Sequence, residues 1–127
     1  MIRIIVIYLY NIITMQIPEL QKEIIAFRDA RDWKKFHNPK DLVNAIAIEV
    51  SELMEHFLRK SQEESYDIAK NKPEVKEEIA DIFNYLLLLA HEADIDLSEV
   101  VLEKIKKNDA KYPVKKVKGI FKKYNEL

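Results

Sequence analysis

The chain has 127 residues, of which 48% are hydrophobic and 34% are charged, proportions typical of a globular domain with enough apolar material for a core. Its 21 basic and 22 acidic residues give a formal net charge of -1, which argues against a broad basic surface for nucleic acid. The chain has no cysteine, which excludes disulfide scaffolds, thiolate zinc sites and cysteine nucleophiles and agrees with a cytoplasmic location.

The elements that the sequence predicts are helices. A single Gly and four Pro leave little turn chemistry for a many-stranded sheet, whereas long segments of Leu, Ile, Lys and Glu favour helices. We therefore predict an all-α fold.

Residues 1–15 form an apolar N-terminal extension, rich in Ile and Tyr. The run is too short to span a bilayer as a helix, and it lacks a basic start and a cleavage site. Its β-branched residues could form a strand with another chain, or Met15 could be the true initiator of an over-extended start. We expect the folded domain to comprise residues 16–127, without a membrane segment.

Apolar spacing predicts a first helix over residues 18–31, followed by a connection over residues 32–39. The second helix should begin at Asn38 and Pro39, because Asn is a favoured N-cap and Pro is favoured at the first helical position. We expect it to end near Lys60. The next segment, residues 61–72, has no apolar stripe and is predicted as a loop or a short irregular helix.

A third helix is predicted from Pro73 to Glu92. It is apolar on almost every side over residues 82–90, so it should be the centre of a bundle or a subunit interface. Asp96 should open a fourth helix that Tyr112 and Pro113 close. The basic tail over residues 115–123 has apolar residues at helical spacing and is expected to add a short packed helix.

Two acidic pairs stand out within these helices. Glu49 and Glu52 fall on the apolar stripe of the second helix, and Glu78 and Asp81 repeat the same spacing on the third. Charged carboxylates beside apolar neighbours are costly unless a positive charge compensates them. Facing one another, the four acids would suit a hard cation such as Mg²⁺. The alternative is that they decorate a solvated face, which is common for charges at helical spacing.

The sequence lacks the residues that two other kinds of catalytic site require. A di-iron site needs Glu-x-x-His elements, and a P-loop needs a glycine-rich phosphate loop; the chain has neither. His56 lies one turn after Glu52 and could approach the acids, although a lone helical histidine is more often structural. A non-catalytic interaction bundle also remains open.

The sequence resembles the MazG-type all-α nucleoside triphosphate pyrophosphohydrolases. Glu49-x-x-Glu52 is followed after 25 residues by Glu78-x-x-Asp81. The flanking segments, residues 31–39 (RDWKKFHNP) and 108–113 (NDAKYP), resemble motifs of the dCTP pyrophosphatase branch. Together these motifs cover about residues 20–113.

The resemblance implies a four-helix bundle assembled as a homodimer or a dimer of dimers. It implies conversion of a nucleoside triphosphate and water to the monophosphate and pyrophosphate, in nucleotide-pool house-cleaning, with water positioned by Glu49 or Glu52. It implies Mg²⁺ ligands at Glu49, Glu52, Glu78 and Asp81. Nucleotide contacts are implied at Trp33, Tyr85, Lys104 and Asn108 and, with less specific matches, at Lys111 and Tyr112.

The chain departs from the branch at two positions. Arg59 stands where a base-stacking Trp is frequent, and Ile24 matches a position that usually holds histidine. Both changes fall on base recognition and leave a preference for dCTP open, while the acidic motif is intact. The nearest enzymatic alternative is a phosphoribosyl-ATP pyrophosphohydrolase.

Overall fold

The structure, a computed structural model, describes residues 15–127, and every regular element among them is helical. The all-α prediction is therefore confirmed, whereas the expectations for residues 1–14 lie outside the described residues. In chain order, the elements are α2 (Ile17–Asp29), η1 (Lys34–Phe36), α3 (Pro39–Glu55), α4 (Gln62–Asn71), α5 (Pro73–Glu92), α6 (Leu97–Lys111), α7 (Val114–Val117) and η2 (Tyr124–Glu126).

The chain divides into two compact units, one ending at Asp94 and the other beginning at Ile95. The first unit holds α2 to α5, and the second holds α6, α7 and η2. None of the described helices is long and apolar enough to cross a membrane.

The predicted helix starts are confirmed by their caps. The Asn38 side chain accepts a hydrogen bond from the backbone N–H of Asp41 at 3.0 Å, and Pro39 is the first residue of α3. Asp96 accepts from the N–H of Glu99 at 3.0 Å and so opens α6. These bonds satisfy N–H groups that have no partner within the helix.

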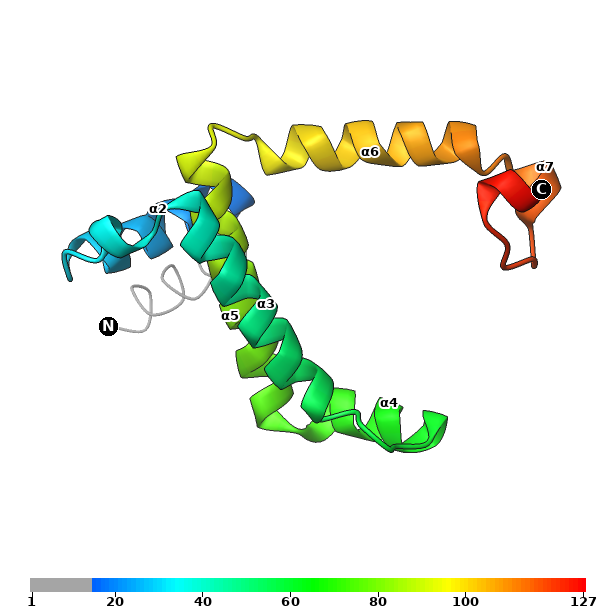
Figure 1. The fold of residues 1–127 in the computed structure, drawn as a ribbon, viewed down its shortest axis with the longest axis horizontal. Coiled ribbons are helices and arrows are strands. Elements are labelled where there is room, and N and C mark those ends of the chain that lie inside the picture. The colour runs from blue at the N-terminus through cyan, green and yellow to red at the C-terminus, as the bar shows by residue number, and fades with distance from the viewer. Residues whose placement is uncertain (1–14) are drawn as a thin grey trace, which may run out of the picture. The chain divides into compact units, whose positions relative to one another are not determined.

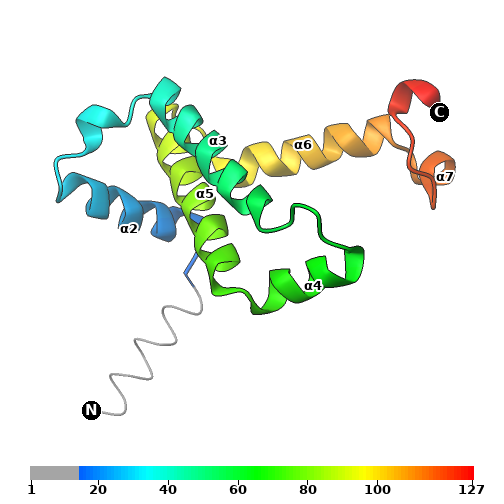
Figure 2. The ribbon, with the colours of Figure 1, turned by 60° about the horizontal axis from the view of Figure 1, so that its bottom comes forward.

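Helix α5 is the centre of the first unit. Helices α3 and α5 lie side by side, with α2 against the C-terminal half of α5 (Figures 1 and 2). Leu42 of α3 and Val75, Leu87 and Leu88 of α5 are almost fully buried. Gln21 of α2 donates a hydrogen bond from Nε2 to the carbonyl oxygen of Leu87 at 2.8 Å.

The apolar circumference of α5 is only partly covered within its unit. Leu87, Leu88 and Ala90 are buried, as predicted for a bundle centre, but Ile79 and Leu86 remain exposed. One side of α5 therefore presents apolar surface to whatever lies beyond this unit.

Three predicted segments need correction. Residues 61–72 contain the regular helix α4, because Ser61 and Glu64 form a reciprocal capping box. Helix α3 ends at Glu55 rather than near Lys60. After Glu55 the backbone N–H groups donate to carbonyl oxygens three residues earlier instead of four, and Arg59 takes a left-handed conformation with φ of 58°. The tail forms only the single turn of α7, because Gly119 (φ 76°) leads the backbone out of a helix.

Candidate metal and nucleotide site

Three glutamates form the candidate metal cluster. Glu49 and Glu52 of α3 and Glu78 of α5 each offer one carboxylate oxygen, and these oxygens lie within 4.8 Å of one another. The arrangement follows from the i, i+3 spacing, which places two acids on one side of α3, and from the packing of α3 along α5. The predicted pairing of acids across two helices is therefore present for three of the four residues.

The electrostatics of the cluster favour a bound cation. Burial, together with the charges of Glu52, Asp81 and Glu78, raises the pKa of Glu49 above its usual value. No Lys or Arg in residues 15–127 forms an ion pair with the three glutamates. Carboxylate oxygens are the ligands that Mg²⁺ and other hard divalent cations prefer, so the donor set fits such an ion.

Asp81 lies beside the cluster rather than in it. Its oxygens are outside the 4.8 Å group, but its charge contributes to the raised pKa of Glu49. Burial, the charge of Glu49 and the charge of Asp81, in decreasing order of effect, raise the pKa of the Tyr85 hydroxyl. Asp81 thus links the acidic cluster to the neighbouring pocket, which it also lines.

The pocket has a volume of about 550 Å³, which falls in the usual range for small-molecule sites. It lies in the first unit between α2, the turn around η1 and α5. Its walls are mainly apolar and aromatic, and they are formed by Leu20, Glu23, Ile24, Phe27, Arg28, Trp33, His37, Asp81, Phe83, Asn84, Tyr85, Leu87 and Leu88.

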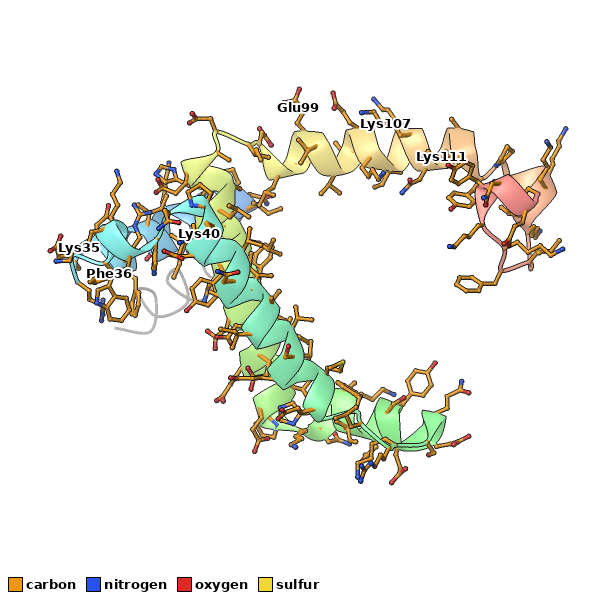
Figure 3. The ribbon with its side chains drawn as sticks, viewed as in Figure 1. Lys35, Phe36, Lys40, Glu99, Lys107 and Lys111 are labelled. Carbon is orange, nitrogen blue, oxygen red and sulfur yellow. The ribbon has the colours of Figure 1, made fainter. Side chains whose placement is uncertain are left out.

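Trp33 presents a partly free aromatic face at this pocket. Its side chain is 43% exposed, and its ring meets Phe27 edge to face with centroids 6.0 Å apart. The Arg31 guanidinium lies 3.6 Å from the centroid of the Phe27 ring and holds that pair at the surface. The turn continues through Lys35 and Phe36, whose side chains point outward (Figure 3).

His37 brings a polar atom to the same wall. Its Nδ1 is buried and has no hydrogen-bond partner among the described residues. Burial and the nearby charge of Arg28 lower the pKa of His37, against the opposite effect of Glu92, so the ring is neutral at pH 7. The ring lies edge to face with Tyr85, 6.2 Å between centroids.

The remaining predicted substrate residues belong to the second unit. Lys104, Asn108 and Lys111 lie on α6, all exposed, and Tyr112 caps its end. Figure 3 shows α6 side chains, including those of Glu99 and Lys107, standing out from the helix. The substrate contacts of these residues stay a prediction.

Comparison with known proteins shows a match to the MazG-like family model over residues 44–127, which is more than half of the chain. The chain belongs to the MazG-like family. The resemblance inferred from the acidic motif is therefore confirmed.

Curated relatives in this family are dCTP pyrophosphatase 1 of Mus musculus, 38% identical, and that of Homo sapiens, 35% identical, both over 104 residues. These matches cover 80% of this chain and 61% of the relatives' length. A crystal structure of a pyrophosphatase from Archaeoglobus fulgidus is 45% identical, with a TM-score of 0.71, over 76% of this chain and 91% of that one. The chain therefore resembles that pyrophosphatase in fold as well as in sequence.

Sequence reasoning missed two buried groups of this MazG-like site. Arg28 is 1% exposed and donates hydrogen bonds to Asp29 at 2.8 Å and to Glu92 at 2.6 Å. Burial opposes its charge, but these hydrogen bonds keep the pKa of Arg28 raised. Arg28 lies four residues after Ile24, on the apolar stripe of α2, and this position was the sequence feature that could have indicated its burial. His37 lies in the segment of residues 31–39 (RDWKKFHNP), but no neighbouring residue indicated that its Nδ1 would be buried.

Proposed function

We propose that this protein is a Mg²⁺-dependent nucleoside triphosphate pyrophosphohydrolase that converts a nucleoside triphosphate and water to the monophosphate and pyrophosphate. The observation that carries the proposal is the cluster of three glutamate oxygens within 4.8 Å, next to a mainly apolar and aromatic pocket of about 550 Å³. The relatives, which are named dCTP pyrophosphatase 1 and pyrophosphatase, support the same reaction.

The acids have defined roles in this proposal. Glu49, Glu52, Glu78 and Asp81 hold the cation, which when bound neutralises phosphate charge and acidifies water. Glu49 or Glu52 orients the attacking water and accepts its proton. The water oxygen forms a bond to the α-phosphorus as the bond to the bridging oxygen breaks, and pyrophosphate leaves. No covalent enzyme intermediate is needed, and the chain has no cysteine to form one.

The base enters the pocket between α2 and α5 in this proposal. Trp33 and Tyr85 present aromatic faces to it, and His37 lies in the same pocket wall. Lys104 and Lys111 contact phosphate oxygens as point charges, with Asn108 and Tyr112 beside them. We propose dCTP as the first substrate to test, although Arg59 and Ile24 alter the family pattern.

We also propose a homodimer or a dimer of dimers. Ile79 and Leu86 on α5 are exposed within the first unit, and the apolar residues Val101, Leu102 and Ile105 of α6 are 54–60% exposed within the second. A lone 15-residue helix is marginal in water, so α6 needs a packing partner. Sedimentation should give at least a dimer at micromolar concentration. A monomer would contradict the proposed assembly but would leave the proposed reaction unaffected.

The reaction is tested by incubating the protein with Mg²⁺ and each common nucleoside triphosphate, and separately with phosphoribosyl-ATP, and identifying the products. We expect monophosphate and pyrophosphate in equal amounts, and no turnover in EDTA. Orthophosphate as the first product would overturn the proposal. Turnover confined to phosphoribosyl-ATP would instead assign the alternative enzyme.

A matched pair of variants ties the reaction to the cluster. Glu52→Gln removes a ligand charge while keeping the side-chain shape, and we expect turnover to fall by about 100-fold or more. Glu55→Gln makes the same change on the same helix at an exposed residue outside the cluster, and it should retain full activity. Equal activity of the two variants would show that the cluster takes no part.

A further inference from the structure

His56 joins the acidic cluster to a lysine. It caps the C-terminal end of α3, and its ring reaches the beginning of α5. Its Nδ1 lies 2.8 Å from Nζ of Lys72, and its Nε2 lies 3.7 Å from Oε1 of Glu78. Nε2 is buried and has no hydrogen-bond partner among the described residues. The ring therefore stands between a fixed donor and a carboxylate of the cluster.

The lysine determines which ring nitrogen carries the proton. An ammonium group has only donors, so Nδ1 must accept in its contact with Lys72. The ring N–H then lies on Nε2, the nitrogen that faces Glu78. A protonated Nε2 cannot bind a metal ion, but it can donate a hydrogen bond to a carboxylate oxygen.

We propose that His56 is a positioning residue for Glu78, held by Lys72 in the tautomer that donates to the carboxylate. This inference rests on the metal site of the proposed function. When one Glu78 oxygen binds the cation, the other accepts the hydrogen bond from Nε2, and the orientation of the carboxylate is fixed. The bond also satisfies a buried donor, which is costly to leave unpaired.

Groups that orient a metal ligand in this way affect metal affinity more than they affect the fold. Removing such a partner usually weakens metal binding by about 10-fold or more. A residue that only joined α3 to α5 would instead change the stability of the metal-free protein. These two readouts separate positioning from packing.

The test is Mn²⁺ affinity of the full chain without nucleotide, measured by electron paramagnetic resonance, together with melting in EDTA. We expect His56→Leu to weaken Mn²⁺ binding about 10-fold. His56→Gln should recover most of the affinity, because its amide accepts from Lys72 through oxygen and donates to Glu78 through nitrogen. His91→Leu, at an exposed histidine near the end of α5, is the matched control and should bind as wild type.

Lys72→Met gives a second test, in which the direction of the change in Mn²⁺ affinity is decisive. Loss of a positive charge near the cluster would by itself tighten cation binding, whereas loss of the fixed tautomer weakens it. We expect weaker Mn²⁺ binding, and tighter binding would overturn the proposal.

Two further results would contradict it. Wild-type affinity in His56→Leu would show that the histidine positions nothing and leave the proposed reaction standing. Failure of the wild-type protein to bind Mn²⁺ at all would remove the metal site itself, and with it the proposed function. If His56→Leu melts before it can be measured, Lys72→Met still decides the question.

Discussion

The two ends of α5 hold negative charge in different ways. Near its C-terminal end, Glu92 accepts a hydrogen bond from the buried guanidinium of Arg28, which also binds Asp29. Toward its N-terminal end, Glu78 lies within 4.8 Å of Glu49 and Glu52, with no Lys or Arg of residues 15–127 paired to any of the three. The C-terminal end is thus the arginine-paired end, whereas the acids near the N-terminal end have no such partner among the described residues and form the acidic end.

The difference separates a structural ion pair from the proposed metal site. A buried arginine between two carboxylates is compensated within the protein and ties α2 to α5. Carboxylates that repel one another weaken the metal-free fold, and such a cost is typical of sites that bind a ligand. The contrast predicts that variants at the two ends will respond differently to metal.

The largest effect on stability is expected at the arginine-paired end. Arg28→Met should lower the free energy of unfolding by about 3 kcal/mol, because it leaves Asp29 and Glu92 without their buried partner. Urea denaturation measures this loss. Lys22→Met, an exposed position on the same helix, is the control. Similar small losses in both variants would show that the buried ion pair does not hold α2 in place.

The next effect is the response to Mg²⁺. At 100 times the dissociation constant, Mg²⁺ should raise the free energy of unfolding by about 2.7 kcal/mol, because it binds only the folded cluster. Glu78→Gln should abolish this gain in thermal melts, and Glu92→Gln at the other end of α5 should retain it. A wild-type melting temperature unmoved by Mg²⁺, with and without nucleotide, would refute the metal site.

The acidic end of α5 was predictable from the sequence, and the arginine-paired end was not. Glu49, Glu52 and Glu78 are placed by local helical spacing, and Pro73 marked the start of α5 correctly. The Arg28–Glu92 pair joins residues 64 positions apart, and no local pattern encodes such a contact.

The points that the sequence left open also have physical causes. Over residues 61–72 the sequence did not distinguish a loop from a short irregular helix because the apolar stripe there is weak, although the Ser61 and Glu64 capping box of α4 was present in the sequence. The predicted roles of Lys104 and Asn108 stay predictions, because they depend on what packs against α6, which neither helical spacing nor capping determines. Local rules thus predicted most helices and the acidic pairs, whereas long-range contacts needed the structure.

The smallest expected effect concerns the repulsion within the cluster itself. Because burial and neighbouring acids raise the pKa of Glu49 in the folded protein, its neutral form is favoured by folding. Its stabilising contribution is therefore present below the unfolded value of 4.5 and is lost as pH rises through the raised folded value. At pH 7 without metal, the ionised carboxylate destabilises the fold.

Glu49→Gln should remove that cost and raise the free energy of unfolding at pH 7 by about 0.5 kcal/mol, in the range measured for exposed charge interactions. The gain should vanish at a pH well below 4.5, where the wild-type carboxyl is neutral in both states. Melts in EDTA at the two pH values measure the difference, with Glu55→Gln as the control on the same helix. A loss of stability at pH 7 would mean that the Glu49 charge is already compensated, and the two ends of α5 would then not differ as described.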